Sequence, residues 1–227
     1  MLHASVISVM IAGLPLQAGS REEISRAVQE SVLEATVRVQ HLASRGDGSG
    51  VVIAHENGST YILTAAHVVP DGDDVAITFY PRDGRPIEMR GLVRDRAANE
   101  DIAMIVVQMK KPPSAIAPLC PKAELPPKFL PQPLPVVTTG LGPLGKPESI
   151  LDRITDHKLI TKPDSSQAFH WEADKEQAIG RSGGGLFDGA GRLIGICSGT
   201  RAGKGYYVSI YEIRSVLSKR GWRFLVK

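Results

Sequence analysis

The chain has 227 residues, of which 42% are hydrophobic and 22% are charged, a composition typical of a soluble globular protein that buries one large core or two smaller ones. Its formal net charge is only +3, and the lysines and arginines are scattered without a basic stripe of interleaved aromatic residues, so nucleic-acid binding has no support. The two cysteines are too few for a disulfide framework and have no histidine at ligand spacing, so we expect no metal site.

The N-terminal segment predicts export. Residues 6–16 are largely apolar and are followed by Gln17-Ala18-Gly19-Ser20, which indicates a signal peptide over residues 1–18 that is cut after Ala18. No lysine or arginine precedes the apolar run, and the alternative is an uncleaved start that is disordered or touches a membrane. The alternative location of the protein is then the cytoplasm. The run is too short to span a bilayer and no later segment is long enough, so we expect no stable membrane insertion of the mature chain.

The next predicted unit covers residues 19–111 and combines a short helix with many strands. A capping box of Ser20 and Glu23 predicts a helix that reaches about Gln29. From residue 35 to residue 107, short β-rich runs are separated by the turn dipeptides Asn57-Gly58, Asp71-Gly72 and Asp83-Gly84. This spacing indicates an antiparallel barrel or sandwich.

Two residues of this unit are candidates for catalysis. His67 follows the small residues Ala65 and Ala66, so its imidazole can approach other groups closely. Asp101 precedes the apolar run 102–107, where a carboxylate drawn into the interior needs a strong donor such as an imidazole N–H. The plain alternatives are a core histidine bound to a backbone carbonyl and an aspartate that merely ends a strand. The other histidines lack such a context and are predicted to lie on the surface: His3, His41, His55, His157 and His170.

A proline-rich segment over residues 112–135 is predicted to connect two units. It holds nine of the sixteen prolines, a density that forbids regular helix and central strand. Cys120 lies in this connector and Cys197 in a predicted strand, so they either pair or remain independent thiols.

The last unit, residues 136–227, resumes short strands. The clearest are 134–139 and 193–198, and the chain closes with a helix that begins with a capping box of Ser209 and Glu212 and stops near Gly221. Residues 140–147 contain a GxGxxG pattern, but Pro147 has no hydroxyl for Mg²⁺ and Pro143 removes an N–H that would cradle phosphate. We therefore interpret this segment as a surface loop.

Residues 180–187 read GRSGGGLF and place Ser182 between glycines, directly before an apolar strand. Glycines allow the sharp backbone turn that brings N–H groups close to a reacting carbonyl. Taken alone the segment is a weak indicator, because glycine-serine runs are common in ordinary turns. Its significance depends on a base and a carboxylate elsewhere in the chain.

The ordered motifs TAAH (64–67), DIA (101–103) and GRSGG (180–184) resemble those of the chymotrypsin-like (trypsin-like) serine peptidases. A Gly48-Ser49-Gly50 strand before TAAH makes the bacterial HtrA (Deg) branch the closer match, from about residue 32 to the C-terminus. The resemblance implies an all-β fold of two antiparallel β-barrels, with His67 and Asp101 from the first barrel, Ser182 from the second and the active-site cleft between them. The α/β-hydrolases and subtilisins place the same three groups in other orders.

The resemblance further implies a serine endopeptidase that needs no cofactor and acts on exported or unfolded proteins or peptides. His67 would be the base, Asp101 its orienting carboxylate and Ser182 the nucleophile, with an oxyanion hole formed by the backbone N–H groups of Gly180 and Ser182. The alternative is a catalytically silent module that binds peptides through its cleft. The sequence contains no PDZ domain of the kind that HtrA proteases usually carry. The resemblance therefore gives no reason to expect trimerisation or peptide-activated regulation.

Arg181 departs from the family pattern, in which digestive enzymes have an aspartate and HtrA proteins usually an asparagine. An arginine cannot pair with a new N-terminal amine, so we expect a nearby carboxylate as its partner, with Asp174 and Glu176 as candidates. For the specificity pocket, spacing from the serine places Glu176 near the floor, which would favour lysine or arginine in the substrate, whereas HtrA enzymes generally prefer small aliphatic residues. The remaining predicted wall residues are Ile179, Ser198 and Gly199.

Overall fold

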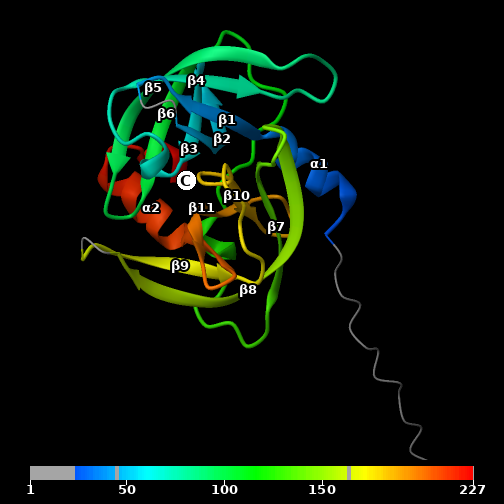
Figure 1. Ribbon diagram of the computed structural model, residues 1–227, viewed down its shortest axis with the longest axis vertical. Coiled ribbons are helices and arrows are strands. Elements are labelled where there is room, and N and C mark those ends of the chain that lie inside the picture. The colour runs from blue at the N-terminus through cyan, green and yellow to red at the C-terminus, as the bar shows by residue number, and fades with distance from the viewer. Residues whose placement is uncertain (1–23, 44–45, 163–164, 227) are drawn as a thin grey trace, which may run out of the picture.

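The computed structural model describes residues 24–43, 46–162 and 165–226, which form two closed antiparallel β-barrels with short helices attached (Figure 1). The strands of the first barrel are β1 (Thr36–His41), β2 (Asp47–Glu56), β3 (Ser59–Thr64), β4 (Asp74–Phe79), β5 (Ile87–Ala97) and β6 (Ile102–Gln108). Those of the second are β7 (Leu134–Leu141), β8 (Pro147–Thr161), β9 (Gln167–Ala173), β10 (Gly185–Phe187), β11 (Leu193–Arg201) and β12 (Lys204–Ser209). The predicted double-barrel fold is confirmed.

The first barrel closes in the strand order β1-β2-β3-β6-β5-β4. In β4 buried and partly exposed residues alternate, as expected for a strand with one face toward the barrel core, whereas all but the last residue of β6 are buried. The β2–β3 hairpin turns at the predicted Asn57-Gly58, where both residues have positive φ, 50° and 74°. This is the backbone that a two-residue hairpin of type I′ requires.

The second barrel repeats this arrangement in the order β10-β11-β12-β9-β8-β7. The proline-rich connector contains only one short 3-10 helix, η2 (Lys122–Glu124), and Leu119 forms an isolated bridge with Leu193 of β11. The β7 and β8 strands meet at the turn in the 140–147 segment, which is therefore a hairpin loop. Both predicted strands of this unit, 134–139 and 193–198, lie within β7 and β11.

The helix near the N-terminus lies further along the chain than predicted. Helix α1 (Arg26–Glu34) begins after Ser25, whose Oγ accepts a hydrogen bond from Val28 N at 3.3 Å, so the capping serine is Ser25. The predicted capping box at Ser20 and the signal peptide lie outside the described residues. The helix packs on β7 and β8 of the second barrel although it precedes the first barrel in sequence.

The C-terminal helix α2 (Ile210–Lys219) is confirmed, but its predicted capping box is wrong. Ser209 is the N-terminal cap by backbone conformation, and its side chain makes no capping hydrogen bond. Glu212 instead accepts a hydrogen bond from the backbone N–H of Phe169 in β9 at 3.2 Å. The carboxylate thus ties the helix to the second barrel, and the chain leaves the helix through Gly221, whose φ is +88°.

Other side chains qualify the predictions from sequence. His41 and His170 are buried, with 0% and 2% exposure, so their predicted surface positions are wrong. Cys120 and Cys197 are both buried free thiols, which decides the alternative that the sequence left open.

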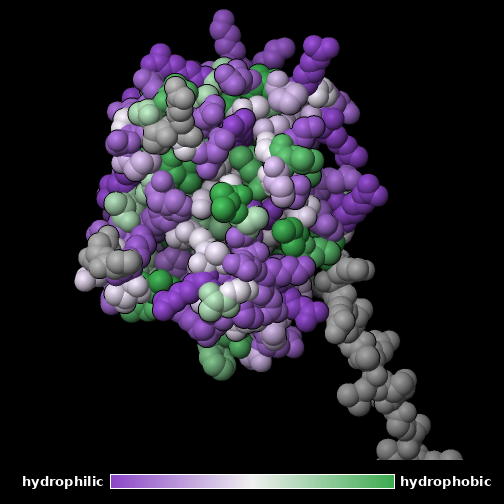
Figure 2. All heavy atoms as spheres, viewed as in Figure 1, coloured by the Kyte–Doolittle hydropathy of each residue, from purple (hydrophilic) through white to green (hydrophobic). Residues whose placement is uncertain are grey.

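In one view of the surface, hydrophobic residues form separate patches among hydrophilic ones (Figure 2). No helix in the described part of the chain is long and apolar enough to cross a membrane.

Candidate active site

His67 and Asp101 meet at the edge of the first barrel. His67 lies in the short 3-10 helix η1 (Ala66–Val68) after β3, and Asp101 ends the turn that leads into β6. Asp101 adopts a φ of +61°, a conformation that aspartate tolerates better than most residues. Its Oδ1 accepts a hydrogen bond from His67 N at 3.0 Å, and His67 Nδ1 lies 3.0 and 2.9 Å from Oδ1 and Oδ2. One carboxylate therefore holds both the backbone and the ring of the histidine.

The Asp101 carboxylate also receives a hydrogen bond from the second barrel. Ser198 in β11 donates from Oγ to Asp101 Oδ2 at 2.5 Å, a role that the sequence did not indicate. Burial alone would raise the pKa of Asp101, but the hydrogen bonds from His67 and Ser198 outweigh it and lower that pKa. The carboxylate is therefore ionised at neutral pH and can stabilise positive charge on the imidazole.

Ser182 lies in a tight turn that precedes β10 and faces the first barrel. Gly180 and Gly183 on either side have φ values of +92° and +82°, which glycine adopts without strain. A Cβ atom at Gly183 would lie 2.1 Å from the carbonyl oxygen of Ser49 and 2.2 Å from Thr64 Oγ1. The glycines thus serve two purposes, since they permit the turn and let it approach β2 and β3 closely.

Two of the backbone donors of this turn are open. Throughout the described ranges, no acceptor pairs with the backbone N–H of Gly180 or of Ser182. Both residues line a cleft of about 300 Å³, and His67 lines the same cleft. Unpaired backbone donors beside a serine are the arrangement that an oxyanion requires. In the part of the chain that the structure describes, no hydrogen bond joins the Ser182 hydroxyl to His67.

Ser49 of β2 fastens the serine turn to the first barrel. Its backbone N–H donates to the Ser182 carbonyl at 2.7 Å, and its Oγ donates to the Gly180 carbonyl, also at 2.7 Å. The same Oγ accepts a hydrogen bond from Leu141 N at 2.8 Å. In the sequence, the Gly48-Ser49-Gly50 strand was recognisable only as a family motif. Its flanking glycines were the signal for a close approach, and Gly48 indeed lies against Ser182 and Val68.

The cleft brings together some of the predicted wall residues. Ile179 and Gly199 line it, whereas Ser198 does not and instead binds Asp101. Glu176 is exposed and does not line this cleft, and the next residue, Gln177, is buried and does. The complete lining also contains Gly46, Asp47, His67, Val68, Pro70, Ala178, Gly180, Ser182, Cys197 and Thr200.

Arg181, between Gly180 and the serine, is almost completely buried, with 2% exposure. Its guanidinium donates from Nε to Gln177 Oε1 at 2.8 Å, from Nη2 to Thr138 Oγ1 at 3.0 Å and from Nη1 to the Glu148 carbonyl at 3.3 Å. All three acceptors are neutral.

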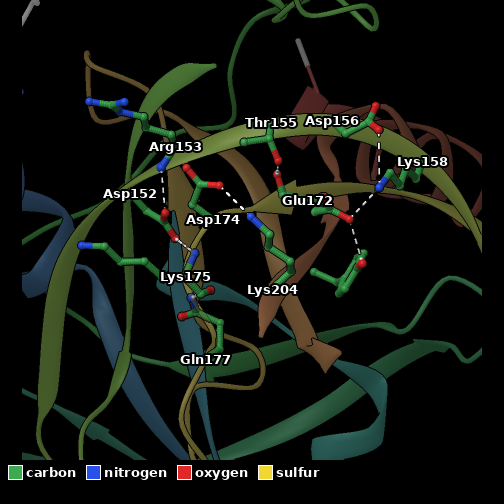
Figure 3. Close-up of polar contacts among 11 residues, drawn as sticks. Asp152, Arg153, Thr155, Asp156, Lys158, Glu172, Asp174, Lys175, Gln177 and Lys204 are labelled. Atoms are coloured by element: carbon green, nitrogen blue, oxygen red, sulfur yellow. Dashed lines mark hydrogen bonds and ion pairs between the residues drawn. The ribbon is translucent and has the colours of Figure 1, made fainter. Parts of the chain in front are cut away.

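The expectation that Arg181 pairs with Asp174 or Glu176 is therefore wrong. Asp174 binds Lys204 Nζ at 2.8 Å on the outside of the second barrel, where Figure 3 shows the two side chains joined. Glu176 is exposed, whereas the side chain of Arg181 points into the barrel. Spacing along the sequence could not reveal this, because the direction of the Arg181 side chain depends on the backbone turn that separates Arg181 from Glu176.

Comparison with solved structures identifies proteins of the same fold. The Rv3671c protease from M. tuberculosis, in its active form, superposes with a TM-score of 0.71 at 20% identity. The match covers 97% of this chain and 95% of the Rv3671c chain. The serine endoprotease from Yersinia pestis has a TM-score of 0.63 at 22% identity, over 85% of this chain and 64% of that chain. The HtrA-type protease AlgW, solved with a tripeptide, has a TM-score of 0.66 at 21% identity, over 86% of this chain and 63% of that chain.

No curated protein sequence matches this chain. The sequence model of the trypsin-like peptidase domain, in contrast, matches residues 48–196, which is well over half of the chain. That span begins at the glycine strand beside Ser182 and includes the segments of His67, Asp101 and Ser182. The chain is therefore a member of the trypsin-like peptidase family.

Proposed function

We propose that this protein is a serine endopeptidase that hydrolyses peptide bonds through His67, Asp101 and Ser182. The observation that carries the proposal is the hydrogen-bonded pair of His67 and Asp101, whose imidazole lines the same cleft as a serine with unpaired backbone donors. Membership of the trypsin-like peptidase family supports it. Asp101 does not line this cleft but holds the imidazole that does, so three distant segments of the chain contribute to one site.

In the proposed reaction, His67 accepts the proton from Ser182 Oγ as that oxygen attacks the peptide carbonyl carbon. The resulting oxyanion is bound by the N–H groups of Gly180 and Ser182, each of which is worth about 3–4 kcal/mol in such sites. His67 then donates the proton to the leaving amine, an acyl-enzyme remains, and water releases the acid by the same steps. Asp101 keeps the imidazole in the required tautomer throughout.

The primary specificity pocket is proposed to accept uncharged side chains. Asp47 is the one acidic residue among the described residues that line the cleft, and its carboxylate is already paired with Arg38. A library of peptides should therefore be cleaved after small or aliphatic residues. Dominant cleavage after lysine or arginine would contradict this proposal and would support the earlier prediction that Glu176 lies near the floor of the pocket.

A second candidate function is a silent module that binds peptides through the cleft. It is favoured by the missing hydrogen bond between Ser182 and His67, although such contacts are often long before substrate binds. Labelling with a fluorophosphonate probe separates the two functions, because only an activated serine reacts. We expect labelling of the wild type and of Ser59→Ala, a control far from the cleft, and none of Ser182→Ala. An unlabelled, folded wild type would exclude the peptidase and leave the binding module.

Export through residues 1–18 is proposed from the sequence alone. If it is correct, mass spectrometry of the protein recovered from an exporting host gives an N-terminus at Gly19. An intact Met1 in a protein found only in the cytoplasm would contradict export.

A further inference from the structure

Arg181 is a buried cation whose charge no carboxylate balances. Among the ion pairs of the described residues, none includes Arg181. Burial of an unbalanced charge is costly, and a hydrophobic side chain of similar size would avoid this cost. Its presence beside the reactive serine therefore calls for a role other than stability.

The surrounding backbone makes room for this side chain. Gly140 in β7 faces it so closely that an added Cβ would lie 2.9 Å from Arg181 Cα and 3.0 Å from its Cβ. Gly184 is equally restricted, because its Cβ would lie 2.1 Å from the Thr139 carbonyl oxygen. The serine turn can therefore lie against β7 only because these positions are glycine.

The three hydrogen bonds of the guanidinium connect the serine turn to two other parts of the site. Thr138 and the Glu148 carbonyl fix it to β7 and β8. Gln177 belongs to the cleft wall, and its amide is held at both ends, since Nε2 donates to the Lys175 carbonyl at 2.8 Å. A planar guanidinium can serve three separated acceptors at once, whereas an ammonium on a flexible stem cannot hold the same geometry.

The hydrogen bonds that start at Arg181 and Gln177 continue through Lys175 to the buried carboxylate of Asp152. Lys175 N donates to Asp152 Oδ2 at 3.3 Å, and Lys175 Nζ donates to the Leu151 carbonyl at 2.7 Å. Figure 3 shows Asp152, Lys175 and Gln177 in succession, from β8 into the loop after β9. The loop that carries the cleft wall is therefore fixed to β8 at its start and to Arg181 at its end.

We propose that Arg181 is a positioning residue, which holds the oxyanion-binding turn against β7 and β8 and aligns it with Gln177 of the cleft wall. The proposal rests on the proposed peptidase function. The backbone of Arg181 lies between the two oxyanion donors, so a rotation of this turn would displace both of them at once. The Arg181 charge also acts on this part of the barrel, since it opposes the burial that raises the pKa of Cys197 to about 12.

The test is the rate of fluorophosphonate labelling, measured together with its amplitude. The amplitude counts folded active sites and the rate constant reports the reactivity of each site, so a merely structural role would reduce only the amplitude. We expect Arg181→Met to lower the rate constant about 10–100-fold with most of the amplitude retained. Arg181→Lys should recover part of the rate, and the exposed Arg153→Met on β8 should match the wild type.

Thr138→Val tests the same contact if Arg181→Met fails to fold, because it removes one acceptor without a change of shape. A rate constant reduced about 2–5-fold at full amplitude is expected for this variant, in line with the loss of one hydrogen bond. Rate constants equal to the wild type in either folded variant would overturn the proposal while the peptidase function stands. A wild type that is not labelled at all would overturn the peptidase function itself.

Discussion

At the scale of single residues, Asp101 is the group on which both barrels converge. Three hydrogen bonds from His67 and Ser198 reach one carboxylate that is 5% exposed, and together they keep it ionised. The pair of His67 and Asp101 was predictable from the sequence because both belong to recognisable motifs. The contribution of Ser198 was not, because it is an ordinary strand residue 97 positions away from Asp101.

Ser198→Ala should weaken catalysis without removing any reacting group. The lost hydrogen bond to a charged acceptor is worth at least about 1.5 kcal/mol, which corresponds to a kcat/KM lowered about tenfold or more. The pKa of Asp101 should rise, so activity on the acid side should be lost at a higher pH than in the wild type. A pH profile of kcat/KM measures both effects, with Ser59→Ala as the control. A profile unchanged in height and position would show that Ser198 does not support Asp101.

At the scale of elements, the site depends on the contact between β2 and the turn that carries Ser182. Ser49 makes two hydrogen bonds across this contact, and Gly183 provides the space for it. Local propensity alone does not bring the two elements together, because the turn depends on glycines with positive φ and β2 belongs to the other barrel. The contact is therefore made by close packing of backbone on backbone.

Gly183→Ala should break this contact. Its Cβ would collide with the Ser49 carbonyl oxygen at 2.1 Å and its φ of +82° is unfavourable, so we expect a loss of at least about 3 kcal/mol in the free energy of unfolding. Gly203→Ala is the matched control, since its φ is +74° but no atom lies within 4 Å of an added Cβ. That variant should lose only about 1 kcal/mol. Urea denaturation of both proteins tests this, and equal losses would refute the packing argument.

At the scale of the whole molecule, two features outside the cleft hold distant parts of the chain together. After α2 the chain returns to the first barrel, where Arg220 and Trp222 bind the Asp95 carboxylate at 2.7 and 3.1 Å. On the second barrel, the His157 ring lies against Phe169 and Trp171 of β9 and Tyr211 of α2, with ring centroids 5.0, 4.3 and 5.6 Å away. These contacts join the β8–β9 hairpin to the C-terminal helix.

The His157 cluster predicts a loss of stability in acid. Burial, aided by the charges of Lys128 and His170 and opposed by Asp156, lowers the pKa of His157 to about 4. The unfolded chain binds this proton near pH 6.5, so stability is unaffected above that pH and falls as the pH decreases toward 4. Because the ring is only partly buried, solvent screening limits the loss to about 1–2 kcal/mol.

Thermal melting at pH 7, 5.5 and 4 measures this effect. His157→Phe keeps the ring packing but cannot bind a proton, so its melting temperature should fall less between pH 7 and pH 4 than that of the wild type. The melting temperature of His55→Gln, a variant at a histidine outside the cluster, should fall as much as that of the wild type. An identical decrease in His157→Phe and the wild type would assign the acid sensitivity to other groups, such as the buried His170, whose pKa burial also lowers.

Local patterns in the sequence were enough to predict short strands, a proline-rich connector and, through the resemblance carried by the ordered motifs, two barrels with His67, Asp101 and Ser182 as candidate site residues. Tertiary structure alone decided what surrounds those residues. Arg181 turns into the barrel toward neutral acceptors, Glu176 remains exposed while Gln177 lines the cleft, and Ser198 supports Asp101. A side chain's direction and burial depend on the packing of segments that are far apart in sequence. Arg181, for example, follows Gly180, whose φ of +92° turns the backbone, and a local sequence pattern does not show where such a turn directs the next side chain.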